Sequence, residues 1–169
     1  MGIQPLNGSA SSTAPQGPWL CAVAYVLDTP IVSKSNHRRS KGSNQWEKFR
    51  AFEEFVTFTT RSVLPATWPP LAADAPFSNR PVVCLSIVAS TLLDTANLSK
   101  SVADALEGVC YHNDASARAV SSLSVRSSVP HVVVGIAALD AGATLDEISA
   151  AATKLQEASV QLFNDTISE

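Results

Sequence analysis

Hydrophobic and polar residues follow two different periods along this chain, and each change of period marks a new element. β-branched and aromatic residues gather at 19–27 and predict a first strand. From 44 to about 63 the large apolar residues recur at spacings of three and four, which predicts a helix. The helical spacing assigns the aromatic stripe to the core rather than to a base-stacking surface, and its members are Trp46, Phe49 and Phe52.

The second half of the chain repeats this change of period. The most continuous apolar run, 81–90, predicts a buried strand, and the pattern from 95 to about 109 predicts a helix. Two further strands are predicted at 117–126 and 131–138, before an amphipathic helix at 145–163. The order β–loop–α–β–α–β–β–α is typical of an α+β fold, in which helices pack on a small mixed β-sheet.

The amino-acid composition indicates which part of the chain is expected to fold. Hydrophobic residues make up 46% of the chain and charged residues 16%, which favours a folded domain. Residues 1–18 are rich in Gly, Ser, Pro and Gln and predict a flexible tail. We expect one domain at 19–139 and a C-terminal helical extension at 140–169.

Cysteine usage and hydropathy indicate a cytoplasmic location. No signal sequence and no apolar stretch long enough for a membrane span is recognisable. The three cysteines are widely spaced and form no metal-binding pattern, so we expect buried thiols in a reducing compartment: Cys21, Cys84 and Cys110.

Positive charge is gathered in one segment of a chain whose formal net charge is −3. A nucleic-acid binder of this net charge must concentrate its cations locally, because affinity follows the cations that face phosphates. The segment 33–43 contains no acid, and it is either a solvated loop or a phosphate-contacting one. Its cations are Lys34, Arg38, Arg39 and Lys41.

The segment 92–115 carries the candidate chemistry. Asp94 stands at the predicted strand-to-helix turn, and Asn113 and Asp114 follow the helix. Along the helix a polar stripe lies beside the apolar face and is formed by Asn97, Lys100 and Asp104.

These residues also have ordinary structural interpretations. Asp94 is suited to cap the helix, and Lys100 with Asp104 could form a surface ion pair. Asn113 and Asp114 are typical of turns. His112 is expected to be a loop residue without a chemical role.

The spacing of these residues resembles the RusA family of Holliday junction resolvases. The family motif D-x-x-N-x-x-K-x-x-x-D-A-L-x-G-V runs here from Asp94 to Val109, and the family's acidic pair corresponds to Asn113-Asp114. Upstream, a proline followed by a basic stretch begins here at Pro30. The resemblance extends from the first strand to about residue 139.

The resemblance implies a homodimeric, magnesium-dependent endonuclease, with manganese as a substitute metal. Such enzymes cut four-way DNA junctions by paired nicks in recombination and repair, and a phage or prophage origin is typical. The implied catalytic residues are Asp94, Lys100 and Asp114. The implied metal ligands are Asp94, Asp104, Asn113 and Asp114, and the implied DNA-binding residues are Lys34, Arg38, Arg39 and Lys41.

Magnesium takes oxygen ligands, so we expect the carboxylates of Asp94 and Asp114 to lie close enough to share one ion. Two departures from the family pattern weaken that site. Ala96 stands where the family has a second aspartate, and Asn113 replaces one member of the acidic pair.

Three hypotheses remain open from the sequence. The chain is a weakened endonuclease, with Asp104 as the nearest replacement ligand. Alternatively, it is an inactive protein that binds branched DNA on the same fold. In the third hypothesis it is an interaction module whose C-terminal helix docks a partner.

Overall fold

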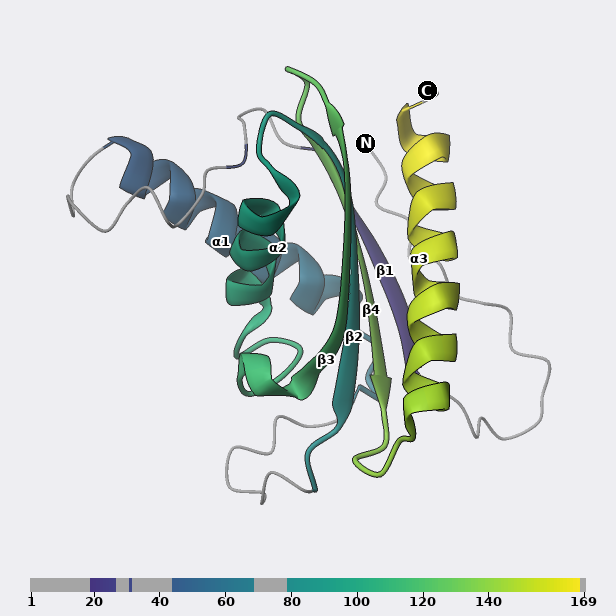
Figure 1. Ribbon diagram of the computed structural model, residues 1–169. Helices are drawn as coiled ribbons and strands as arrows, with labels where there is room; N and C mark the ends of the chain where they lie inside the picture. The colour runs from purple at the N-terminus through teal and green to yellow at the C-terminus, as the bar shows by residue number, and fades with distance from the viewer. Residues whose placement is uncertain (1–18, 27–30, 32–43, 69–78, 168–169) are drawn as a thin grey trace.

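The predicted order of elements is confirmed in the computed structural model, which describes residues 19–26, 31, 44–68 and 79–167. The basic segment with Lys34, Arg38, Arg39 and Lys41 lies outside the described residues. The elements, shown in Figure 1, are β1 (Trp19–Val26), α1 (Asn44–Val63), β2 (Val82–Thr91), α2 (Thr95–Leu106), the short 3₁₀ helix η3 (Asp114–Ser116), β3 (Ala117–Arg126), β4 (His131–Leu139) and α3 (Leu145–Ile167).

The strands form one mixed four-stranded sheet in the order β1-β4-β2-β3. β4 pairs antiparallel with both β1 and β2. β3 pairs parallel with β2, and its register runs from Val83 opposite Ala117 to Thr91 opposite Arg126. A parallel pair needs a crossover connection, and α2 supplies it.

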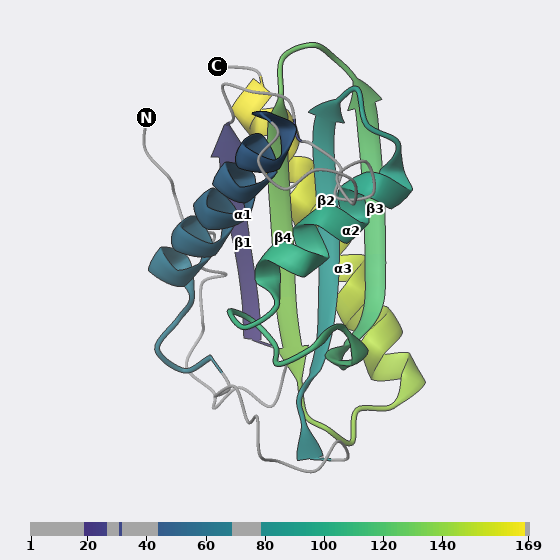
Figure 2. The ribbon, with the colours of Figure 1, turned by 90° about the vertical axis from the view of Figure 1, so that its left-hand side faces the viewer.

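Helices cover both faces of this sheet. α1 and α2 lie on one face and α3 lies on the other (Figures 1 and 2). β2 and β4 are the two central strands, and every residue in them is buried. A strand covered on both faces has no need of alternating polarity, which is why the sequence at 81–90 is almost continuously apolar.

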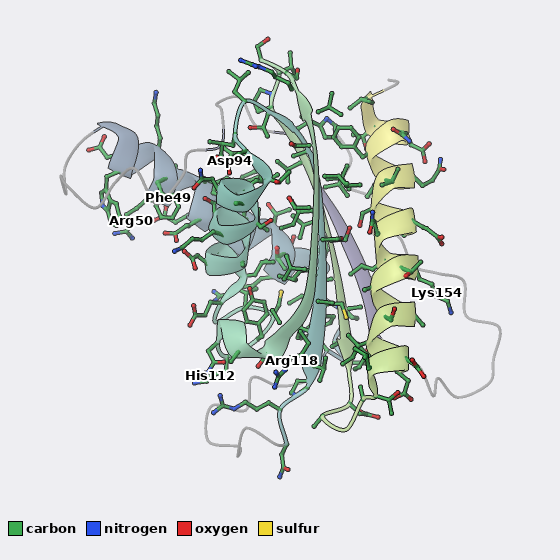
Figure 3. All side chains as sticks on the ribbon, in the orientation of Figure 1. Phe49, Arg50, Asp94, His112, Arg118 and Lys154 are labelled. Atoms are coloured by element: carbon green, nitrogen blue, oxygen red, sulfur yellow. The ribbon has the colours of Figure 1, made fainter. Side chains whose placement is uncertain are left out.

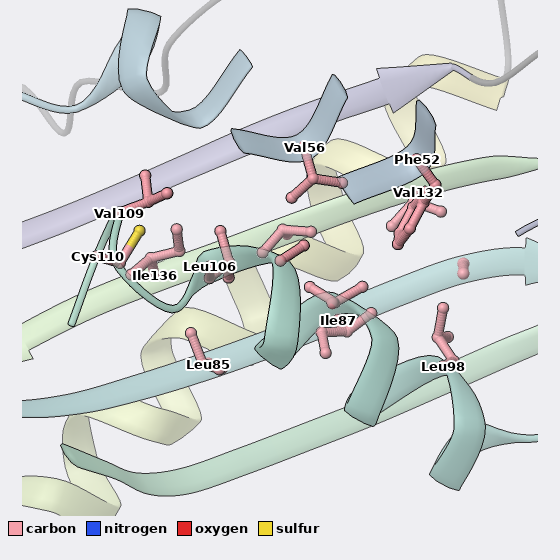
Figure 4. Close-up of a cluster of buried hydrophobic side chains, with 14 of the residues drawn as sticks. Phe52, Val56, Leu85, Ile87, Leu98, Leu106, Val109, Cys110, Val132 and Ile136 are labelled. Carbon is pink, nitrogen blue, oxygen red and sulfur yellow. The ribbon is translucent and has the colours of Figure 1, made fainter. Parts of the chain in front are cut away.

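The larger part of the core lies between the sheet and the α1–α2 layer. Leu85 and Ile87 from β2 meet Leu98 and Leu106 from α2 in this layer (Figure 4). The ring of Phe52 comes from α1, and Phe49 is fully buried. Phe49 and Phe52 confirm the assignment of the α1 aromatic stripe to the core, whereas Trp46 is only half-buried. Cys84 and Cys110 are buried free thiols, as expected.

α2 ends earlier than the sequence pattern predicts. The pattern predicted a helix to about Val109, but the last helical residue is Leu106. The chain turns at Gly108, whose φ of 74° lies in the left-handed region that favours glycine. Val109 is nevertheless buried in the core. Its apolar side chain therefore reflects burial and not helical structure.

α3 is fixed at its start and along its buried face. Thr144 and Glu147 form a capping box, in which the Thr144 N–H donates to Glu147 Oε2 at 2.7 Å and the Glu147 N–H donates to Thr144 Oγ1 at 3.3 Å. Leu155 and Ser159 face β4 at Gly135, where an added Cβ would overlap Ser159 Oγ. None of the described helices is long and apolar enough to cross a membrane.

The close packing of α3 on β4 predicts a large effect at Gly135. Gly135→Ala should lower the free energy of unfolding by about 1–3 kcal/mol, because the new methyl group meets Leu155 and Ser159. Urea denaturation measures the change. Gly142→Ala is the control, since a Cβ there meets nothing within 4 Å. Equal stabilities of the two variants would contradict this view of the α3 interface.

Candidate functional site

The first candidate residue, Asp94, caps α2. The backbone N–H of Asn97 donates to Asp94 Oδ1 at 2.8 Å, and the Asn97 side-chain amide donates to Asp94 Oδ2 at 2.7 Å. The backbone N–H of Asn97, followed by its side-chain amide, lowers the pKa of the exposed Asp94 carboxyl. Asp94 is therefore ionised, and both of its oxygens already accept hydrogen bonds.

The next residues lie along α2 at different depths. Ala96 is exposed in the first turn of the helix, and that turn contains no acidic residue. Lys100 is exposed one turn further on, whereas Asp104 is half-buried near the end of the helix. The polar stripe predicted from the sequence therefore exists, but only Lys100 presents its charge fully to solvent.

Two aromatic side chains hold the loop after α2 in place. Tyr111 is fully buried, and its hydroxyl donates to the Ala103 carbonyl at 2.6 Å. The Trp68 indole N–H donates to the Cys110 carbonyl at 3.1 Å. The Gly108 N–H donates to the Tyr111 carbonyl at 2.8 Å and closes the turn. The loop is thus a fixed support for the residues that follow.

Asn113 and Asp114 follow this support directly. The Asn113 carbonyl accepts the Ser116 N–H at 3.0 Å in the 3₁₀ turn that leads into β3. Asn113 Oδ1 is buried and accepts no hydrogen bond from the residues that the structure describes. Asp114 is the first residue of η3, and His112 is exposed beside it.

The two halves of the motif lie at opposite ends of the sheet. Asp94 follows β2, whose last residue pairs with Arg126, while Asn113 and Asp114 precede β3, whose first residue pairs with Val83. Because a strand rises about 3.3 Å per residue, the length of β3 separates the two ends by about 30 Å. Figure 3 shows Asp94 and His112, the neighbour of Asn113, toward opposite ends of the sheet.

Among the residues that the structure describes, one copy of the chain brings no complete set of oxygen ligands for magnesium together. Ligand oxygens around one magnesium ion lie about 2.1 Å from it, so they must come from side chains that are close neighbours. Asp94 is far from Asn113, and it already accepts two hydrogen bonds from Asn97. Over the described ranges, no group of three or more His, Cys, Asp or Glu side chains is placed to hold a metal ion. The expectation that Asp94 and Asp114 lie close together in one chain is not met.

Sequence reasoning missed the residues that position the second half of the motif. Neither Trp68 nor Tyr111 is a position of the family motif, and Trp68 is far from that motif in sequence. Tyr111 had a usable signal, since it continues the apolar run that starts at Val109. The sequence analysis also did not single out Arg118 as a cation near the motif. Arg118 is exposed and lies at the same end of the sheet as His112 (Figure 3).

Comparison with known protein families gives one finding. The family profile described as endodeoxyribonuclease RusA matches residues 28–137, which is more than half of the chain. The match includes α1, β2, α2 and β3 and ends within β4, so α3 lies outside it. No curated protein matches the chain.

Because Asp94 caps α2, substitutions that remove the cap and substitutions that keep it should differ in stability. Asp94→Ala should destabilise the start of α2, because the Asn97 N–H loses its acceptor. Asp94→Asn should keep most of that stability, since asparagine caps helices about as well as aspartate. The measurements are the midpoint of thermal unfolding and the hydrogen-exchange rate of the Asn97 amide. Equal exchange rates in the two variants would show that the cap is unimportant.

Proposed function

Because this chain belongs to the RusA endodeoxyribonuclease family, we propose that it is a structure-selective endonuclease that acts on four-way DNA junctions. The family match over residues 28–137 is the observation that carries this proposal. We place the activity in DNA recombination and repair, in the cytoplasm, with paired nicks on symmetric strands. Residues 19–139 would supply the catalytic domain.

Each group of candidate residues has a physical role in this proposal. Lys100 is exposed on α2, and its ammonium can approach a phosphate and stabilise negative charge that develops there. The basic segment with Lys34, Arg38, Arg39 and Lys41 would contact phosphates along the arms of the junction. Branched DNA is the proposed partner. Phosphate contacts carry no sequence information, so a protein that binds through them can select DNA by its shape.

A divalent metal, magnesium or manganese, is the proposed cofactor, with oxygen ligands drawn from Asp94, Asp104, Asn113 and Asp114. Within one copy, Asp94 lies at the opposite end of the sheet from Asn113 and Asp114.

A second candidate function is binding of branched DNA without cleavage. Two observations favour it: Ala96 offers no oxygen at a position where the family has a carboxylate, and Asp94 is already engaged by Asn97. The two functions differ in cleavage and agree in binding, so one assay separates them.

The proposed endonuclease should nick a synthetic four-way junction in the presence of magnesium or manganese and leave a linear duplex of the same sequence intact. Asp114→Asn should abolish nicking, and Lys100→Ala should lower its rate by about 10²–10³-fold, the usual effect of removing a charge-stabilising group. Gel-resolved nicking and binding are measured in parallel. Binding without nicking at every metal concentration would support the second function, and no binding at low salt would exclude both.

The missing carboxylate makes a further prediction at position 96. Ala96→Asp should raise nicking, because it adds a negative oxygen ligand on the exposed first turn of α2, where the helix dipole tolerates an acid. Ala96→Asn is the matched control, since it adds a similar volume without the charge. Equal nicking by the two variants would show that the lost carboxylate does not limit the reaction.

A further inference from the structure

We propose that a β-bulge at the start of β3 holds Arg118 in position to bind a phosphate of the DNA substrate, close to Asn113 and Asp114. Arg80, which precedes β2 at the same end of the sheet, is the second cation of this site. The inference rests on the proposed endonuclease function, and it names the residues that hold the substrate strand beside the second half of the motif.

The bulge is visible in the register between β2 and β3. Val83 pairs with Ala117, but the next residue of β2, Cys84, pairs with Ala119. Arg118 is therefore one extra residue in β3. A bulge bends its strand locally and turns a side chain in a new direction, and bulges are common beside active sites.

The packing of the two alanines shows how the bulge changes the direction of side chains. Residues two apart in a regular strand point to the same face of a sheet. Ala117 instead packs against the core beneath α1 and α2, whereas Ala119 packs against the core beneath α3. The extra residue between them is Arg118, whose side chain is exposed.

Arg118 lies near the second half of the motif. The Asn113 carbonyl accepts the Ser116 N–H at 3.0 Å, so the chain turns tightly just before β3. Four residues span at most about 14 Å, which limits the separation of the Cα atoms of Asp114 and Arg118. Successive phosphates of one strand advance about 3.4 Å along a duplex. A phosphate bound by Arg118 therefore lies within a few nucleotides of Asp114.

Arg80 adds a second positive charge at this end of the sheet. It comes two residues before β2, and the start of β2 lies beside the start of β3 because the two strands are parallel. Arg80 is half-buried, whereas Arg118 is exposed. We therefore assign the main phosphate contact to Arg118 and a supporting one to Arg80.

The acidic residues at this end favour an approach of DNA from the α2 side. Asp146 and Glu147 are exposed in the first turn of α3, on the face opposite α2 (Figure 1). On the α2 side, Asn113 replaces one member of the family's acidic pair and so removes a negative charge. A phosphate meets less repulsion there, and the planar guanidinium of an arginine donates two parallel hydrogen bonds to it.

The bulge and the arginine also have a structural interpretation. β3 is the last strand in the sheet order, and both bulges and charges protect an edge strand from pairing with other chains. Under that interpretation Arg118→Gln would promote aggregation and leave DNA binding unchanged. The salt dependence of DNA binding separates the two interpretations.

Binding of a labelled synthetic four-way junction is measured in EDTA over a range of salt concentrations. Each phosphate contact contributes about 0.9 to the slope of log K against log salt concentration, so Arg118→Gln should lower the slope by about 0.9. Lys154→Gln is the matched control, because it removes the same charge from an exposed position on α3 (Figure 3). An unchanged slope in Arg118→Gln, or an equal loss in Lys154→Gln, overturns the proposal. Arg118→Lys keeps the charge and should keep the slope.

A second experiment locates the phosphate. An uncharged methylphosphonate replaces, one at a time, the phosphates on either side of the crossover of the junction. At one position it should weaken binding by the wild type and leave binding by Arg118→Gln unchanged, because both changes remove the same contact. Additive effects at every position would contradict a specific contact.

Measuring binding without metal keeps this inference apart from the proposed function. A smaller slope in Arg118→Gln, with no nicking by the wild type at any metal concentration, would leave the phosphate site standing and remove the endonuclease function. Nicking by the wild type, with an unchanged slope in Arg118→Gln, would keep the function and overturn the phosphate site. A wild type that does not bind the junction at low salt overturns both.

Discussion

The parallel pairing of β2 with β3 determines the arrangement of everything that follows. A chain that leaves one strand and enters a parallel neighbour must return along the whole length of the sheet. α2 makes this return, and the motif that identifies the family is spread along it. The first aspartate is therefore fixed at one end of the sheet, and the asparagine–aspartate pair is fixed at the other. No side-chain rotation brings them together.

Burial makes this pairing secure. β2 is buried along its whole length, between the α1–α2 layer on one face and α3 on the other. α3 lies outside the family match, yet Ala151, Leu155 and Phe163 belong to its buried face. Without α3, the apolar side chains on that face of the sheet would meet water. The C-terminal helix thus contributes to the core itself, rather than serving only as a surface for a partner.

Asp94 combines a structural role as the cap of α2 with an ionised carboxylate. Its carboxylate caps α2 through Asn97, and the same hydrogen bonds keep it ionised. In the family pattern a second aspartate stands at position 96, so its alanine leaves the capping aspartate as the single acid at this end of α2. The alanine at position 96 therefore removes a carboxylate of the family pattern and leaves the cap of the helix intact.

The sequence by itself determined the order of the elements and the family. Apolar periods reflect burial on one or two faces, which is why residues 44–63 and 117–126 were predicted at their observed limits. The register of Asp94, Asn97, Lys100 and Asp104 is local, so it was also readable. The end of α2 was not, because Val109 is buried by tertiary contacts after the helix has stopped. Tertiary structure alone decided that β2 and β3 run parallel, and hence that the two halves of the motif lie apart. Strand direction depends on partners distant in sequence, and the residues of one strand do not encode it.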